Sequence, residues 1–106
     1  MASKRSKACD ITKTVKWNVA RRDNFRCIIC GSPYGQPNAH YISRAHGGLG
    51  IVKNIVTLCI DCHHKFDQTS YREEYKEYIK NYLSKMYKDW NEEDLVYKKY
   101  DYTSGQ

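Results

Sequence analysis

The stretch CIDCHHKFD, residues 59–67, contains the second of two C-x-x-C pairs in a chain of 106 residues. The first pair lies in CIIC, residues 27–30, and residues 31–58 separate the two pairs. Two thiolates at this spacing bind one side of a tetrahedral ion, and a second pair completes the coordination. Because four cysteines leave no open position on the ion, we expect a structural Zn²⁺ bound by Cys27, Cys30, Cys59 and Cys62.

The alternative use of a C-x-x-C pair is thiol–disulfide chemistry, which two matched pairs disfavour. The chain has five cysteines, and a reducing compartment would favour metal ligation over disulfides. The fifth cysteine, Cys9, stands apart in the basic N-terminal segment and is expected to be a free thiol. A bound metal would add the constraint that a small hydrophobic core needs in order to fold.

Positive charge is concentrated at the N-terminus. The chain carries 18 Lys and Arg against 12 Asp and Glu, which gives a formal net charge of +6. Residues 1–26 contain eight basic and two acidic side chains, so this segment accounts for the whole net charge. Such a segment favours a polyanionic partner, with nucleic acid as the first candidate. Charge alone is equally consistent with a solvated terminus.

The length suits one domain. We expect a flexible basic arm over residues 1–12, a single domain over residues 13–100 with its core at 22–67, and a disordered tail over residues 101–106. No apolar run approaches the roughly 20 residues that span a bilayer. The N-terminus lacks the hydrophobic stretch of a secretory signal. These features predict a soluble, cytoplasmic protein.

Hydrophobic spacing predicts an α+β fold. KTVKWNVARRDNF suggests a short N-terminal helix that stops near Asp23. AHYISR, residues 39–44, and IVTLC, residues 55–59, are short strand candidates on either side of a glycine-rich loop. CHHKFDQ then has the character of the first turns of a helix.

A C-terminal amphipathic helix is expected from about Ser70 to residue 88. Ser70 and Glu73 fit a capping box, and aromatic and aliphatic residues recur at helical spacing after them. We interpret the tyrosines in this stripe as a face that packs on the domain. The less favoured alternative is a platform on which bases stack.

His40, Asn54 and His63 lie between and just after the cysteine pairs. A strand that ends in His40, a loop that carries Asn54 and a helix that opens with His63 would form a compact ββα hairpin. Such a hairpin can hold one divalent ion against a phosphodiester. A neutral imidazole would take a proton from the attacking water, and a metal would stabilise the leaving oxygen.

CIIC together with AHYISRAHGGLGIVKNIVTLCIDCHHKFD resembles the HNH endonuclease family, in the form that carries a structural Cys₄ zinc. The resemblance runs from about Arg22 to Asp67, with looser similarity through the C-terminal segment to small HNH proteins of phages and prophages. It implies a ββα-metal (His-Me finger) core and a metal-dependent endonuclease that hydrolyses DNA by nicking or by double-strand cleavage.

The resemblance also implies roles for individual residues. His40 would be the general base, Asn54 would hold the loop that orients it, and His63 would ligate the catalytic Mg²⁺, Mn²⁺ or Ni²⁺. Asp67 lies one helical turn after His63 and is a candidate second ligand, although it is equally consistent with a surface acid. The DNA backbone would be contacted by Arg21, Arg22, Arg26 and Arg44.

Ala39 departs from the family pattern, because many members place a metal-binding Asp or His directly before the base. Either His63 and Asp67 hold the ion with water and phosphate, or another residue supplies the ligand, or the protein binds DNA with weak or no catalysis. The last account makes the chain a zinc-stabilised DNA-binding module. The resemblance further suggests phage DNA-processing or packaging proteins as partners, and hence the host-cell cytoplasm.

Overall fold

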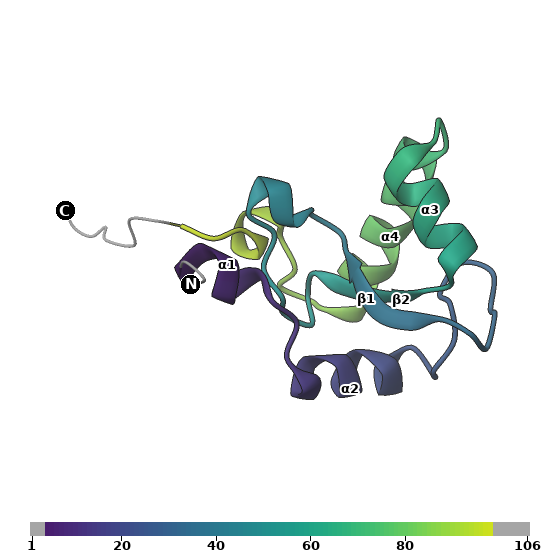
Figure 1. Ribbon diagram of the computed structural model, residues 1–106, viewed down its shortest axis with the longest axis horizontal. Coiled ribbons are helices and arrows are strands. Elements are labelled where there is room, and N and C mark those ends of the chain that lie inside the picture. Colours follow the sequence, from purple (N-terminus) through teal and green to yellow (C-terminus); the bar gives the residue numbers. More distant parts are fainter. Residues whose placement is uncertain (1–3, 99–106) are drawn as a thin grey trace.

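Two short strands form an antiparallel sheet that lies between α2 on one side and α3 and α4 on the other (Figure 1). The computed structural model describes residues 4–98. Its elements, in chain order, are α1 (Lys4–Cys9), α2 (Lys13–Arg22), β1 (Gln36–His40), the 3₁₀ turn η1 (Arg44–His46), β2 (Ile55–Leu58), α3 (Ile60–Gln68), α4 (Arg72–Met86) and the 3₁₀ turn η2 (Glu92–Leu95). The predicted α+β class is confirmed.

Strand β2 is buried along its whole length because helices cover both faces of the sheet. Its sequence, IVTL, is β-prone and carries no charge, as a strand covered on both faces requires. Behind it, the core is completed by buried residues of α3, α4 and η2, namely Phe66, Ile79, Leu83 and Leu95. No helix within residues 4–98 is both long and apolar enough to cross a membrane.

Strand β1 occupies a different span from the strand expected over residues 39–44. It begins at Gln36, and its last residue, His40, pairs with Ile55. Beyond His40 the chain pairs with the loop residue Asn54 instead, whose backbone oxygen accepts from the Tyr41 N–H at 2.7 Å. The strand pairing therefore places His40 at the end of the sheet, directly before the loop that follows.

The N-terminal segment expected to be flexible contains a helix in its described part. Helix α1 spans Lys4–Cys9, and Cys9 is buried. The Gly50 N–H donates to the Ala8 oxygen at 3.0 Å, and a Cβ on Gly50 would approach the Asp10 oxygen to 2.0 Å. The segment thus packs closely on the glycine loop because Gly50 has no side chain, and residues 4–9 form a helix where a flexible arm was expected.

Helix α4 begins later than the capping box predicted. Its first residue is Arg72, its N-cap is Tyr71, and no side chain caps it; the Thr69 hydroxyl accepts from the Tyr71 N–H instead. The interpretation of the stripe as a packed face is confirmed for its centre, where Ile79 and Leu83 are fully buried. The expected tail over residues 101–106 lies outside the described residues.

A buried ion pair joins α2 to the sheet. The Arg22 guanidinium donates two hydrogen bonds to the Asp23 carboxylate, at 2.7 and 3.0 Å, and others to the oxygens of Val52 and Ile55. Asp23 also accepts from the Thr57 N–H of β2 at 2.9 Å. Burial alone would lower the pKa of Arg22, but Asp23 outweighs it and keeps the pKa above its ordinary value. Arg22 is therefore held in place by the fold, and its contact with the DNA backbone stays a prediction.

Candidate functional site: a cysteine quartet and a histidine-bearing loop

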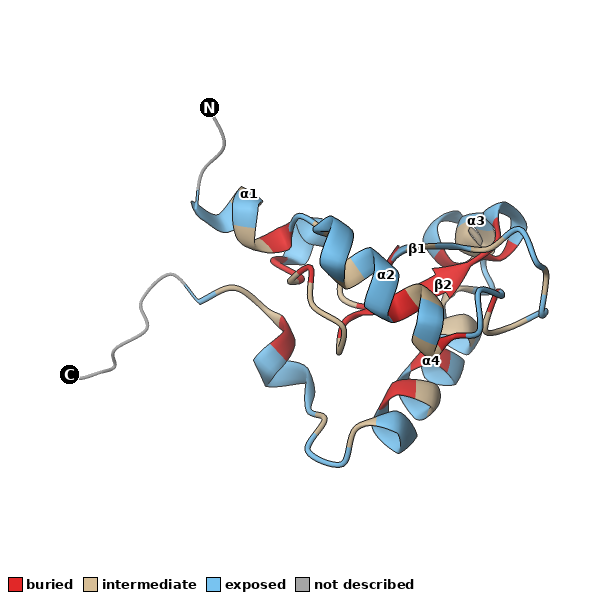
Figure 2. Ribbon diagram, turned by 90° about the horizontal axis from the view of Figure 1, so that it is seen from below, coloured by how far each residue is buried: buried red, intermediate tan, exposed pale blue. Residues whose placement is uncertain are grey.

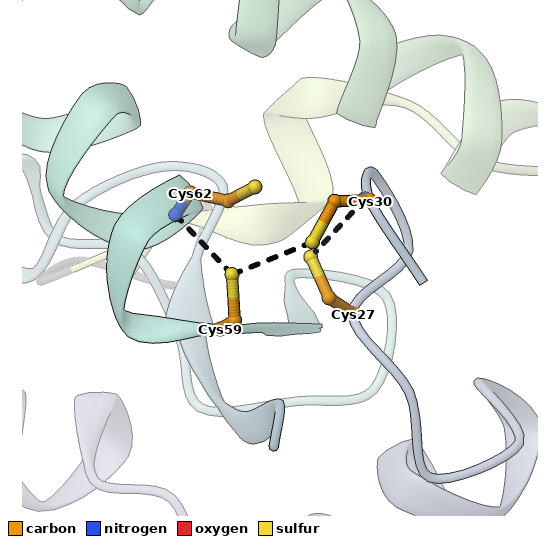
Figure 3. Close-up of side chains that lie close together, drawn as sticks. All are labelled: Cys27, Cys30, Cys59 and Cys62. Atoms are coloured by element: carbon orange, nitrogen blue, oxygen red, sulfur yellow. Dashed lines mark hydrogen bonds between the residues drawn. The ribbon is translucent and has the colours of Figure 1, made fainter. Parts of the chain in front are cut away.

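The four predicted zinc ligands converge. Cys27 and Cys30 come from the loop after α2, while Cys59 and Cys62 lie at the start of α3, and all four sulfurs lie within 4.8 Å of one another (Figure 3). The Sγ atoms of Cys30 and Cys59 are 3.6 Å apart, and none of the cysteines forms a disulfide. Four ligands at about 2.3 Å from a tetrahedral Zn²⁺ would lie about 3.8 Å from one another. The quartet therefore fits a metal ion such as zinc.

Backbone N–H groups stabilise thiolates in this quartet. The N–H of Cys30 points at Sγ of Cys27, and the N–H of Cys62 points at Sγ of Cys59, at 3.5 and 3.4 Å. Burial acts to raise the pKa of Cys27, but such hydrogen bonds outweigh it and lower the pKa to about 7. Burial raises the pKa of Cys62 above its ordinary value. A central cation would favour the thiolate at every position, so we expect metal loading to release protons.

His40 is anchored by the N-terminal segment. Its Nε2 lies 2.9 Å from the backbone oxygen of Cys9. A carbonyl oxygen only accepts, so this contact requires the proton on Nε2 and leaves the lone pair on Nδ1. Burial lowers the pKa of His40; the hydrogen bond to the Cys9 oxygen opposes this shift, and the positive charge of Arg44 adds to it. Together, the Cys9 contact and the lowered pKa favour a neutral imidazole whose basic nitrogen is Nδ1.

Asn54 fixes the loop that follows His40. It is fully buried; its Oδ1 accepts from the Ile42 N–H at 2.8 Å, and its Nδ2 donates to the oxygens of Ile42 and Leu49. The loop approaches itself so closely that a Cβ on Gly48 would reach within 1.6 Å of the Ile42 oxygen. These contacts hold both ends of the loop together; that Asn54 thereby orients His40 for catalysis stays a prediction.

Arg44 shares its anchor with His40. One of its terminal nitrogens donates to the Cys9 oxygen at 2.9 Å, and the other pairs with the Asp10 carboxylate at 2.8 Å. Beside these contacts lies a hollow of about 290 Å³, lined by Arg5, Ser6, Cys9, Arg44 and Ala45. Two guanidinium groups on one open hollow provide a place where a phosphate would be attracted.

His63 and Asp67 face each other on α3. His63 Nε2 lies 3.3 Å from Asp67 Oδ2, one turn along the helix, and both side chains are accessible. Among residues 4–98 only the cysteine quartet gathers three or more metal-ligating side chains. Ala39 lies fully buried in the hydrophobic core. The described side chains therefore offer a pair of ligands on α3 and no third one.

The remaining predicted DNA contacts lie on the surface. Arg21 and Arg26 are both exposed, at the end of α2 and in the turn after it. The carbonyl of Cys9, which anchors both His40 and Arg44, was missed by the sequence analysis. Cys9 drew attention only as a thiol, and a backbone acceptor leaves no signal in a residue pattern. A weak clue lay in Gly50, which allows the close approach of this segment.

Comparison with known proteins assigns no family. No family model matches the chain. A curated protein named Anaredoxin, from Nostoc sp. (strain PCC 7120), is 31% identical over 49 residues, which is 45% of this chain and 64% of that protein. The match covers less than two thirds of this relative.

Proposed function

We propose that the protein is a metal-dependent endonuclease of the HNH type, built on a ββα-metal core. One observation carries the proposal: the Cys9 carbonyl fixes Nε2 of His40 as the protonated nitrogen and so leaves Nδ1 as a neutral base. Burial, which lowers the pKa of His40, keeps that base unprotonated at neutral pH. The Asn54 contacts to the loop give the imidazole and Arg44 a rigid frame.

The reaction is the hydrolysis of a phosphodiester. Nδ1 of His40 takes a proton from water while the water oxygen bonds to phosphorus. The bond from phosphorus to the 3′ oxygen breaks, and the leaving oxygen is protonated by solvent. Arg44, at the edge of the arginine-lined hollow, would hold a phosphate oxygen and offset its charge.

His63 and Asp67 would hold the catalytic cation. Their donor atoms, 3.3 Å apart, suit two neighbouring positions on one ion, and water and phosphate oxygens would fill the others. Bound there, a Mg²⁺, Mn²⁺ or Ni²⁺ ion would stabilise the charge that develops on the 3′ oxygen. The cysteine quartet would have no part in this chemistry. It joins the loop that carries Cys27 and Cys30 to the start of α3 and so helps to fix His63.

Ala39 favours a second candidate, a zinc-stabilised nucleic-acid-binding module that does not cut. Its methyl group offers no ligand, and the described residues gather no third ligand beside His63 and Asp67. A third candidate, a small redox protein, rests on the name of the Nostoc relative and on the fact that tetrahedral S₄ sites take iron as well as zinc. Metal analysis and the visible absorption spectrum separate this candidate from the others, because a zinc site is colourless.

Nicking of supercoiled plasmid tests the proposal. The zinc-loaded protein is incubated with Mg²⁺, Mn²⁺ or Ni²⁺, or with no added cation, and His40→Ala is compared with His46→Ala. His46 is exposed on η1 and its ring is hydrogen-bonded to Ser43, so it is the matched control. We expect wild type and His46→Ala to nick with added cation, and His40→Ala to lose at least 100-fold in rate. Equal rates for the two variants would refute the base assignment, and wild-type binding without nicking would favour the second candidate.

A further inference from the structure

An aromatic pair lies exposed on the outer side of α2. The rings of Trp17 and Phe25 have centroids 5.7 Å apart, yet the two residues are 57% and 52% exposed. Figure 2 views the molecule from this side and shows the outer surface of α2 exposed along its length. The core does not use these rings, so packing within the domain does not explain them.

The backbone at Phe25 is strained. Asn24 and Phe25 have φ values of 57° and 58°, in the left-handed region that suits glycine. The turn ends α2 with a hydrogen bond from the Phe25 N–H to the Ala20 oxygen at 2.8 Å. Asparagine adopts this conformation at little cost in free energy, whereas phenylalanine adopts it only with strain. Glycine would allow the same backbone turn without strain. A strained aromatic residue with an exposed ring is the pattern of a binding surface rather than of a structural turn.

Uncompensated positive charge surrounds the pair. The exposed basic residues of this segment are Lys13, Lys16, Arg21 and Arg26, which together with Trp17 and Phe25 we call the α2 patch. The only acid between residues 13 and 26 is Asp23, which is buried and paired with Arg22. Within residues 4–98, no ion pair involves a basic residue of the patch. Its charge is therefore available to a polyanion.

We propose that the α2 patch binds a single-stranded or locally unpaired segment of nucleic acid, with bases stacked on Trp17 and Phe25 and phosphates bound by the surrounding basic side chains. Base faces are accessible to aromatic side chains only where the strand is unpaired, and stacking tolerates any sequence. This inference rests on the proposed action on nucleic acid and narrows its substrate. Because α2 covers the face of the sheet opposite α3, the patch is separate from His63 and Asp67 (Figure 1).

The test is a binding titration that needs no cleavage. Fluorescence anisotropy follows the zinc-loaded protein on a labelled single-stranded oligothymidine, without added divalent cation, and on the corresponding duplex. The variants are Trp17→Ala and Phe25→Gly, and the control is Tyr71→Ala. Tyr71 is 51% exposed at the start of α4, on the other side of the sheet, and matches Phe25 in exposure.

We expect each patch variant to weaken single-strand binding by about 5- to 100-fold, and Tyr71→Ala to leave it unchanged. The melting temperature of Phe25→Gly should stay the same or rise, because glycine relieves the strain at this position. Trp17→Phe should keep most of the affinity but lose the quenching of tryptophan fluorescence on binding. Trp90, whose indole donates to the Lys53 oxygen, should keep its emission.

Three results would overturn the inference: wild-type affinity in both patch variants, an equal loss of affinity for single strand and duplex, or a clear fall in the melting temperature of Phe25→Gly. The first two would show that the rings do not stack on bases, and the third would show a structural role. The nuclease proposal is tested separately. Normal nicking together with binding that does not depend on Trp17 or Phe25 would refute the binding role of the α2 patch and leave the nuclease proposal intact. Binding that depends on the patch, without nicking, would refute the nuclease proposal and leave the binding role intact.

Discussion

Replacing the neighbouring arginines Arg21 and Arg22 by alanine should change two different properties of the protein. Arg21 is exposed on α2, whereas the Arg22 side chain is only 10% exposed and lies against a carboxylate with no exposed surface. Sequence analysis gave the two the same role in contacting the DNA backbone. The structure predicts that Arg22→Ala acts on stability and that Arg21→Ala acts on binding.

The size of the effect follows from what Arg22→Ala leaves behind. Asp23 keeps only the Thr57 N–H and the Tyr82 hydroxyl as partners for a buried charge. The carbonyl oxygens of Val52 and Ile55 lose their guanidinium donors as well. Breaking a buried pair from one side costs about 3–5 kcal/mol, a large share of the roughly 5–15 kcal/mol that stabilises a typical domain. Arg21→Ala should cost less than about 0.5 kcal/mol.

Urea unfolding and salt-dependent binding separate the two roles. We expect a much lower urea midpoint for Arg22→Ala at an unchanged m-value, and a midpoint close to wild type for Arg21→Ala. Losing one phosphate contact on a single strand should reduce the slope of log K against log salt by about 0.7 for Arg21→Ala. The milder Arg22→Lys keeps the charge and serves if the alanine variant does not fold. Wild-type stability together with a reduced salt slope in Arg22→Ala would refute the structural assignment.

Three further outcomes are expected. Cys30→Ser should lower bound zinc, measured by elemental analysis, and abolish the folded circular-dichroism signal, because the quartet loses one ligand. The acid limb of kcat/KM should lie below pH 6.5, because burial and then Arg44 lower the pKa of His40; Arg44→Gln should move this limb to higher pH in the nicking assay. Gly50→Ala should slow nicking while zinc stays bound, because its Cβ would displace the Asp10 oxygen and with it the Cys9 oxygen that holds His40. Unchanged nicking would show that this contact of His40 is not needed for catalysis.

Local patterns in the sequence were sufficient for the cysteine quartet and for the positions of α2 and β2. The spacing within each C-x-x-C pair is a property of a few consecutive residues, and the structure brings the two pairs together as predicted. The helix expected from KTVKWNVARR is α2, and IVTLC contains β2. A C-x-x-C pair and the periodicity of a helix or strand each extend over a few neighbouring residues, so they can be recognised without the tertiary structure.

Features that depend on long-range contacts could not be predicted in this way. Arg22 and Arg21 are adjacent in the sequence, and only the position of Asp23 beneath β2 makes one structural and the other exposed. The segment that forms helix α1 was expected to be flexible because it is short and basic. Gly50, about forty residues further along the chain, has no side chain and so lets this segment pack closely on the domain. In both cases the structure depends on a contact with a residue distant in the sequence, Thr57 of β2 for Asp23 and Gly50 for α1, so nearby composition carries no information about it.

Ala39 and Cys9 together explain why the candidate site has two unequal halves. Around His40, the proposed base, a carbonyl sets the tautomer, a buried amide fixes the loop, and two arginines line a nearby hollow. The metal half offers two accessible side chains on α3, because Ala39 contributes only a methyl group to the core. An ion held by two protein ligands binds weakly until phosphate completes its coordination. The proposed nuclease would therefore bind its cation mainly together with its substrate, so cleavage should require more cation than an enzyme with three protein ligands.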